Sequence, residues 1–183
     1  MGGRVGWVTV NGYFYLHFAG EEGLATARAP YDPELSRRLI AGGEVADWEP
    51  LRFELDEGGV VDYLASTFAY RLCSEPLRDV LEARRGATDV VQWLPTIVVD
   101  RSGRELPYWA LHFPTVPDVL NRSRSVLAGP VVVKAVLDRQ LVDGHRLLTL
   151  PKDLTRLILA DQVKSAIEAA GCTGMKFSPI PMA

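Results

Sequence analysis

Residues 67–95 read TFAYRLCSEPLRDVLEARRGATDVVQWLP, and this stretch carries the clearest structural signals in the chain. Residues 67–73 have the composition of a strand, and Ser74 is a suitable N-cap for a helix. Gly86 is expected to end this helix, and residues 90–100 are predicted to form the next strand. The stretch thus predicts a β-α-β unit whose helix buries Leu77, Val80 and Leu81.

A second segment, residues 163–179, follows the same pattern as residues 77–95. Each helix is preceded by an apolar strand and followed by an aromatic-x-Pro sequence, at 93–95 and at 177–179. Asp161 is expected to cap the second helix. Two readings stay open: an internal β-α-β repeat with both helices on one sheet, or two unrelated amphipathic helices that happen to precede strands.

The rest of the chain adds strands and turns around these two units. Asn11-Gly12 is a strong hairpin signal within residues 5–18, and Ser102-Gly103 indicates a second hairpin. Asp32-Pro33 opens a predicted helix that Gly42-Gly43 ends. Pro95 indicates an edge or a bulge in its strand. Further strands are predicted at residues 51–55, 108–113, 131–137, 147–150, 155–159 and 175–177.

These elements predict an α+β fold, in which a mixed and largely antiparallel sheet carries two or three helices. Residues 1–49 are expected to form a hairpin-and-helix extension packed on the main domain, which covers residues 50–183. The absence of any apolar run near the ~20 residues of a membrane span argues against a transmembrane segment. Two cysteines without a CxxC spacing and no clear signal peptide favour the cytoplasm.

Charge is unevenly placed along the chain. The 183 residues carry a net charge of −3, which argues against nucleic-acid binding by bulk charge. Residues 1–70 hold 11 acids and 5 bases, whereas residues 71–183 hold 12 acids and 15 bases. The acids concentrate in residues 44–62. Two interpretations remain for this acidic stretch: a solvated loop region, or a face that meets a basic partner. Apart from Arg52, its charged residues are Glu44, Asp47, Glu49, Glu54, Asp56, Glu57 and Asp62.

No sequence motif indicates catalysis. The chain has no Walker loop, no GxSxG, no HExxH and no Rossmann fingerprint. His17 and His112 fall in apolar strands and are expected to be structural, while His145 follows a turn and is expected to be exposed. We therefore expect neither a cofactor nor a bound metal, and no enzymatic activity. The pair Tyr108-Trp109 belongs either to the core or to an interface.

The order of several short motifs resembles a family of bacterial immunity proteins from polymorphic toxin systems, first noted in myxobacteria. The resemblance covers roughly residues 50–181. It rests on the strand and cap at 72–75 and on 91–95, where Gln92 replaces a more usual acidic residue. Further motifs are Pro107-Tyr108-Trp109 followed by Asp118, and the C-terminal residues 170–179.

The resemblance implies a protein that binds and neutralises one toxin domain, encoded beside it, without nucleic-acid or membrane partners. Toxins that attack nucleic acids have basic clefts, which an acidic face can block by mimicking a polyanion. Two alternatives stay open: a small hydrolase or transferase using His112 or Cys73, and a secretion-system adaptor. The candidate partner-binding residues are Glu44, Asp47, Glu49, Glu54, Asp56, Glu57, Tyr108, Trp109 and Asp118.

Overall fold

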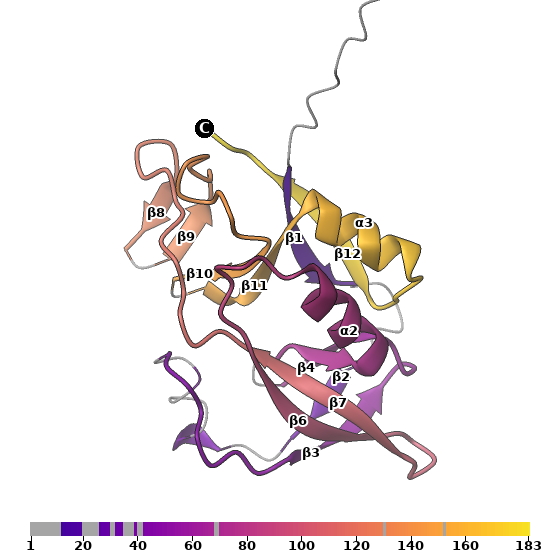
Figure 1. The fold of residues 1–183 in the computed structure, drawn as a ribbon. Helices are drawn as coiled ribbons and strands as arrows, with labels where there is room; N and C mark the ends of the chain where they lie inside the picture. The colour runs from indigo at the N-terminus through magenta and orange to yellow at the C-terminus, as the bar shows by residue number, and fades with distance from the viewer. Residues whose placement is uncertain are drawn as a thin grey trace, which may run out of the picture.

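The computed structural model describes residues 12–19, 26–29, 32–34, 39, 42–67, 70–129, 131–151 and 153–183. The helices that lie wholly within the described residues are α2 (Glu75–Arg84) and α3 (Asp161–Ala169). The strands divide into a closed barrel, a four-stranded sheet and a two-stranded ribbon (Figure 1). They are β1 (Tyr13–Phe18), β2 (Thr26–Arg28), β3 (Leu51–Glu57), β4 (Tyr63–Ser66), β5 (Leu72–Ser74), β6 (Gln92–Val99), β7 (Glu105–His112), β8 (Val126–Ala128), β9 (Val131–Lys134), β10 (Leu147–Leu150), β11 (Asp153–Ala160) and β12 (Met175–Ile180).

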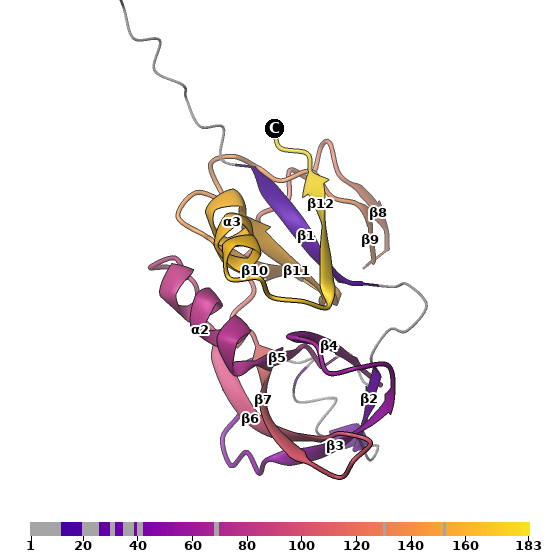
Figure 2. The same cartoon turned by 90° about the vertical axis from the view of Figure 1, so that its right-hand side faces the viewer.

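The barrel closes in the order β2-β3-β6-β7-β5-β4, and Figure 2 shows it nearly end-on as a ring. Two of its pairings, β2 with β4 and β3 with β6, are parallel. Along β3 the side chains alternate, so that Phe53 and Leu55 are buried while Arg52 and Glu54 face solvent. The barrel interior thus forms one apolar core, which includes Ala27, Phe53, Leu64, Leu72, Leu94, Val98 and Ala110.

The second sheet has the order β10-β11-β1-β12 and is antiparallel throughout. Strand β1 comes from the start of the described chain, yet it lies between two C-terminal strands, with Leu16 opposite Leu157 and Phe177. A second core fills the space between this sheet, the two helices and the outer face of the barrel. Its members include Tyr63, Leu77, Leu81, Leu111, Leu157, Val163 and Ile167.

The two helices pack together beside the junction of barrel and sheet (Figures 1 and 2). The predicted cap of α2 is confirmed, because Ser74 Oγ accepts a hydrogen bond from Leu77 N at 3.4 Å. The capping role predicted for Asp161 is wrong. Ala160 occupies the N-cap without a side-chain bond, and Asp161 is the first helical residue. Asp161 still places a negative charge at the positive end of the helix dipole.

Within the described residues strands outweigh the helices α2 and α3, consistent with the α+β class, but the prediction of one mixed sheet is wrong. The units β5-α2-β6 and β11-α3-β12 end in different sheets, so a repeat that places both helices on one sheet is not confirmed. The predicted helix after Asp32-Pro33 and the Asn11 side of the first hairpin fall largely outside the described residues. Within the described part of the chain, no helix is long and apolar enough to cross a membrane.

Pro95 lies within β6, which is an interior strand of the barrel. The parallel pairing with β3 begins only one residue later, where Leu51 is opposite Thr96. On the β3 side, therefore, no ladder bond is lost through the missing N–H of Pro95. The prediction of an edge or a bulge at Pro95 is therefore wrong: β6 is paired on both sides, its register with β7 is continuous, and its pairing with β3 begins just after the proline.

A buried carboxylate joins the barrel half of the molecule to the four-stranded sheet. Asp89 lies in the turn between α2 and β6, and its side chain is fully buried. One oxygen, Oδ2, accepts from Gly86 N at 2.7 Å, Arg146 N at 3.1 Å and Leu147 N at 2.9 Å. The other, Oδ1, meets His145 Nδ1 at 3.0 Å. The exit of α2 is thereby fixed to the start of β10.

The substitution Asp89→Asn is expected to lower the free energy of unfolding by about 3 kcal/mol. An asparagine amide has only one acceptor oxygen for these N–H donors, and its own NH2 group would be buried without acceptors. Urea unfolding followed by circular dichroism measures the change. The exposed Asp79→Asn is the matched control and should shift the free energy by less than about 0.5 kcal/mol. Equal effects of the two substitutions would contradict the role assigned to Asp89.

Candidate partner-binding surface

Most of the predicted acidic residues lie on residues 42–50 and on the strand β3 that follows them. The segment is fixed to the barrel by side chains rather than by strand pairing. The Gln92 amide accepts from Val45 N at 2.9 Å and donates to Val45 O at 2.8 Å. Only an amide can make this pair of hydrogen bonds, since a carboxylate cannot donate to a carbonyl. The pair therefore explains why Gln92 stands where an acidic residue is more usual.

His112 makes a second attachment to the same segment. Its Nε2 lies 2.8 Å from Gly43 O, so this nitrogen carries the proton and donates it to the carbonyl. Gly43 N in turn donates to Pro114 O at 2.8 Å. Burial lowers the pKa of His112 below its ordinary value of 6.5, which keeps the ring neutral at neutral pH. The prediction that His112 is structural agrees with these contacts.

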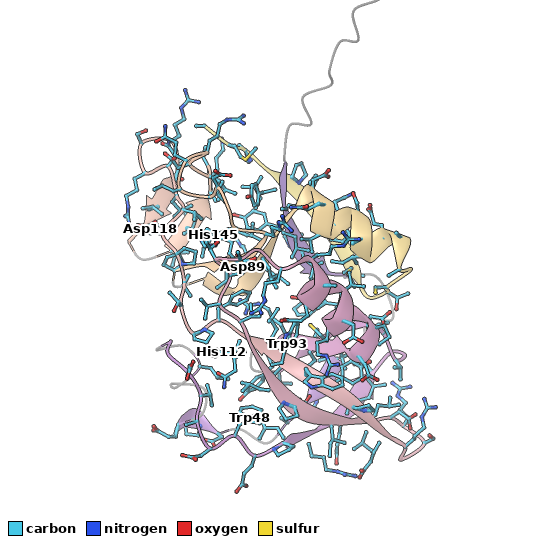
Figure 3. The ribbon with its side chains drawn as sticks, in the orientation of Figure 1. Trp48, Asp89, Trp93, His112, Asp118 and His145 are labelled. Atoms are coloured by element: carbon cyan, nitrogen blue, oxygen red, sulfur yellow. The ribbon has the colours of Figure 1, made fainter. Side chains whose placement is uncertain are left out.

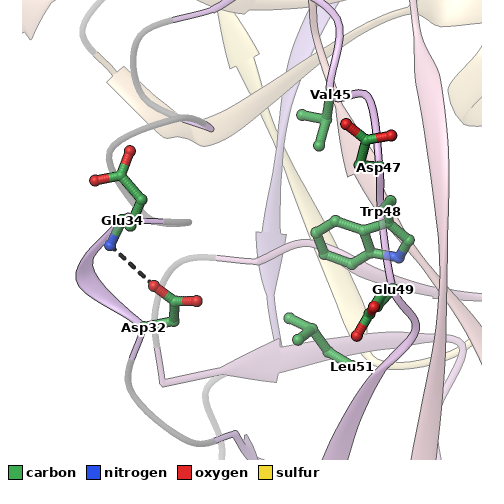
Figure 4. A pocket seen from close by; sticks show the side chains of 7 residues that line it. All are labelled: Asp32, Glu34, Val45, Asp47, Trp48, Glu49 and Leu51. Carbon is green, nitrogen blue, oxygen red and sulfur yellow. Dashed lines mark hydrogen bonds between the residues drawn. The ribbon is translucent and has the colours of Figure 1, made fainter.

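Trp48 makes the third attachment and also lines a hollow. Its Nε1 donates to Pro95 O at 2.7 Å, which holds the indole against the middle of β6. The hollow has a volume of about 230 Å³, and Figure 4 shows the indole on one wall with Asp32 and Glu34 across from it. Asp47 has a φ of 54°, which is unusual for a residue other than glycine. The lining consists of Asp32, Glu34, Val45, Asp47, Trp48, Glu49 and Leu51.

The exposed carboxylates of this region differ in their partners. Asp56 forms an ion pair with Arg28, and Arg52 forms one with Glu105. Five other carboxylates make no ion pair or hydrogen bond with any residue that the structure describes. We call these five the unpaired acidic face; they are Glu44, Asp47, Glu49, Glu54 and Glu57.

The structure does not bring the remaining predicted site residues to this face. Tyr108 is buried, and its hydroxyl donates to Val61 O at 2.6 Å. Trp109 is half-buried beneath the Arg78 guanidinium, 3.9 Å from the ring centre. Asp118 forms an ion pair with Arg122 and lies well apart from Trp48 (Figure 3). Trp48 itself was missed by the sequence reasoning, although it stands between two acidic residues.

The groups considered for catalysis are engaged in structural contacts. Cys73 is buried, which raises the pKa of its thiol far above the ordinary value. His17 Nε2 lies 2.7 Å from Ser178 Oγ. His145 was expected to be exposed, but it is half-buried against Asp89 (Figure 3). The hydroxyl Thr88 Oγ1 lies 3.3 Å from the same Nδ1 that meets Asp89. Within the described residues, these contacts provide no activated nucleophile.

Comparison with known protein families identifies the family to which the chain belongs. The family model described as "Immunity protein family (Imm11)" matches residues 21–181. The chain therefore belongs to this family, and it is an immunity protein. The match begins before residue 50, so it includes β2 and the segment 42–50 that carries part of the unpaired acidic face. No curated protein matches the chain.

Acidification is expected to destabilise the protein, with His112 contributing. Burial lowers the pKa values of His112 and His17, so the unfolded chain binds protons near pH 6.5 that the folded chain does not. Since the unfolded state binds more protons, the free energy of unfolding falls as the pH is lowered from about 7.5 to 5.5. His112→Gln should reduce this fall while keeping an N–H donor for Gly43 O.

Urea unfolding of wild type and His112→Gln across this pH range measures the dependence. Adding His17→Gln should flatten the dependence further, because the pKa of that residue is lowered as well. An unchanged slope in the His112→Gln variant would show that this histidine does not couple folding to pH.

Proposed function

We propose that this immunity protein neutralises its toxin by binding it, and not by catalysis, and that the unpaired acidic face meets a basic surface of the toxin. The supporting observation is the set of five exposed carboxylates without partners among the described residues. Unpaired surface charges of one sign speed the encounter with an oppositely charged protein and select against like-charged ones. The toxin's basic surface would be a cleft that normally holds a nucleic acid.

The hollow beside Trp48 suits one cationic side chain of such a surface. A lysine or arginine placed there would meet the face of the indole ring and the carboxylates of Asp47 and Glu49. Cation–π contacts are worth about 0.5–1 kcal/mol at exposed sites and more when water is excluded. Trp48 would then act as an anchor within the wider acidic face.

The attachment of residues 42–50 supports this proposal in a second way. The bonds from Gln92, His112 and Trp48 hold the segment before any partner arrives. A preorganised surface loses little conformational entropy on binding, which favours high affinity. We place the protein in the cytoplasm together with the toxin's target, with the toxin encoded in a neighbouring gene of a polymorphic toxin system.

Reversing the charge of the acidic face tests the proposal. The triple variant Glu44→Lys, Glu49→Lys, Glu54→Lys is expected to slow association with the toxin by about tenfold or more, and to weaken the dependence of the rate on ionic strength. Surface plasmon resonance at several salt concentrations measures both quantities. The control reverses three exposed acids of the helices, Glu75, Asp79 and Glu168, and should change association by less than about threefold.

The toxin for this measurement comes from co-expression with the neighbouring toxin gene. Survival of the cells and a stable complex are the expected results, and loss of protection by the triple variant would agree with them. If the triple variant binds as fast as wild type at every salt concentration, the acidic face is not the binding surface.

A further inference from the structure

The ribbon formed by β8 and β9 exposes the largest group of apolar side chains in the described part of the chain. Val126 is 51% exposed, and Val131 and Val133 are each 58% exposed. Leu127 on the same ribbon and Leu141 nearby are exposed as well. The other large exposed apolar residues of the described chain, Val60 and Val90, lie in separate loops, away from this group in the sequence. A clustered apolar surface of this kind usually marks an interaction site.

This ribbon is firmly attached at its base. Val132 is buried in the core between the sheet and the helices. Ser125 Oγ donates to Val136 O at 3.1 Å and accepts from Val136 N at 3.0 Å, which joins the two ends of the hairpin. The exposed valines are therefore presented by a fixed framework.

Both outer edges of the ribbon are open. Strands β8 and β9 pair with each other and with no other strand in the described part of the chain. An edge strand with unpaired N–H and C=O groups is a template for a further strand, and proteins usually protect such edges with charge or by covering them. On this ribbon Lys134, the last residue of β9, is the only charged residue.

The charged residues around the ribbon indicate which kind of partner could bind it. Arg124 precedes β8 and Lys134 ends β9, and both are exposed. Neither side chain has an ion pair with any described residue, whereas the neighbouring Arg122 is paired with Asp118. A second copy docked ribbon to ribbon would bring these cations together and would be repelled. The complementary occupant is an apolar strand flanked by carboxylates.

We propose that the β8–β9 ribbon is a second docking site for the toxin, which adds an apolar strand with acidic flanks to an open edge of the ribbon. This inference rests on the proposed function, since it takes the toxin as the partner. Main-chain hydrogen bonds would supply affinity, and the exposed valines together with Arg124 and Lys134 would supply selectivity. The ribbon packs through Val132 on the core of the sheet half, whereas the segment and strand that carry the unpaired acidic face pack through Val45 and Phe53 on the barrel core.

The test uses the full chain and the purified toxin in an inactive form. The variant Val131→Asp, Val133→Asp is expected to weaken toxin binding by about a hundredfold or more, because it places charge in an apolar contact. The matched control Val60→Asp, Val90→Asp changes two valines elsewhere that are each 46% exposed, and it should stay within threefold of wild type. Urea unfolding establishes that both variants are folded.

A second variant and a second measurement address the ribbon without altering its apolar side chains. Arg124→Glu, Lys134→Glu is expected to weaken binding about tenfold, with a reduced dependence on salt. Hydrogen–deuterium exchange should show new protection of the amides of residues 126–134 in the complex. Protection confined to residues 42–57 would overturn the ribbon proposal.

The remaining outcomes separate this inference from the proposed function. Normal toxin binding by both ribbon variants, with weakened binding by the acidic-face triple variant, overturns the ribbon site and leaves the proposed function standing. A wild-type dimer that Val131→Asp, Val133→Asp converts to a monomer, at unchanged toxin affinity, would show that a second copy covers the ribbon. If wild type does not bind the toxin at all, the proposed function fails, and the ribbon proposal fails with it.

Discussion

The buried carboxylate of Asp89 is the constraint on which the arrangement of the molecule depends. It accepts backbone N–H groups from both sides of the junction, at Gly86 and at Arg146 and Leu147, so neither side can shift without losing a buried hydrogen bond. The approach is close: a Cβ on Gly86 would lie 2.4 Å from Gly144 O. Barrel and sheet are thereby held as one unit, and surfaces on the two halves keep a fixed separation.

Local signals in the sequence predicted the parts of the fold that depend on local chemistry. Ser74 and the apolar spacing after it gave α2, because an N-cap oxygen and a 3.6-residue period act within one helix. Ser102-Gly103 predicted the hairpin that β6 and β7 form. Gly103 adopts a φ of 84° in the turn, a conformation that favours glycine. In both cases the residues that determine the structure are neighbours in sequence.

The parts that were missed depend on pairing between distant segments. Closure of the barrel requires the parallel register of Leu51 with Thr96, and β1 enters the second sheet through Leu16 opposite Leu157. Strand periodicity fixes which side chains share a face, but it does not say which strand lies alongside. Trp48 was missed for the same reason, because its role depends on a carbonyl 47 residues away.

The distribution of satisfied and unsatisfied groups agrees with a protein that acts through its surface. His17, His112 and His145 each have a side-chain or backbone partner, and the thiol of Cys73 is buried. Exposed carboxylates on the barrel half make no ion pair with any described residue, and the β8–β9 ribbon exposes valines beside two cations that are likewise unpaired there. Asp89 holds the barrel half and the sheet half in one arrangement. A partner that binds both surfaces must therefore carry a basic region and an apolar strand with acidic flanks, separated by the same distance as the two surfaces. Under the proposed function, this geometric requirement would add to the selectivity of the protein for its toxin, because a protein that matches one surface and not the other would lose part of the contact.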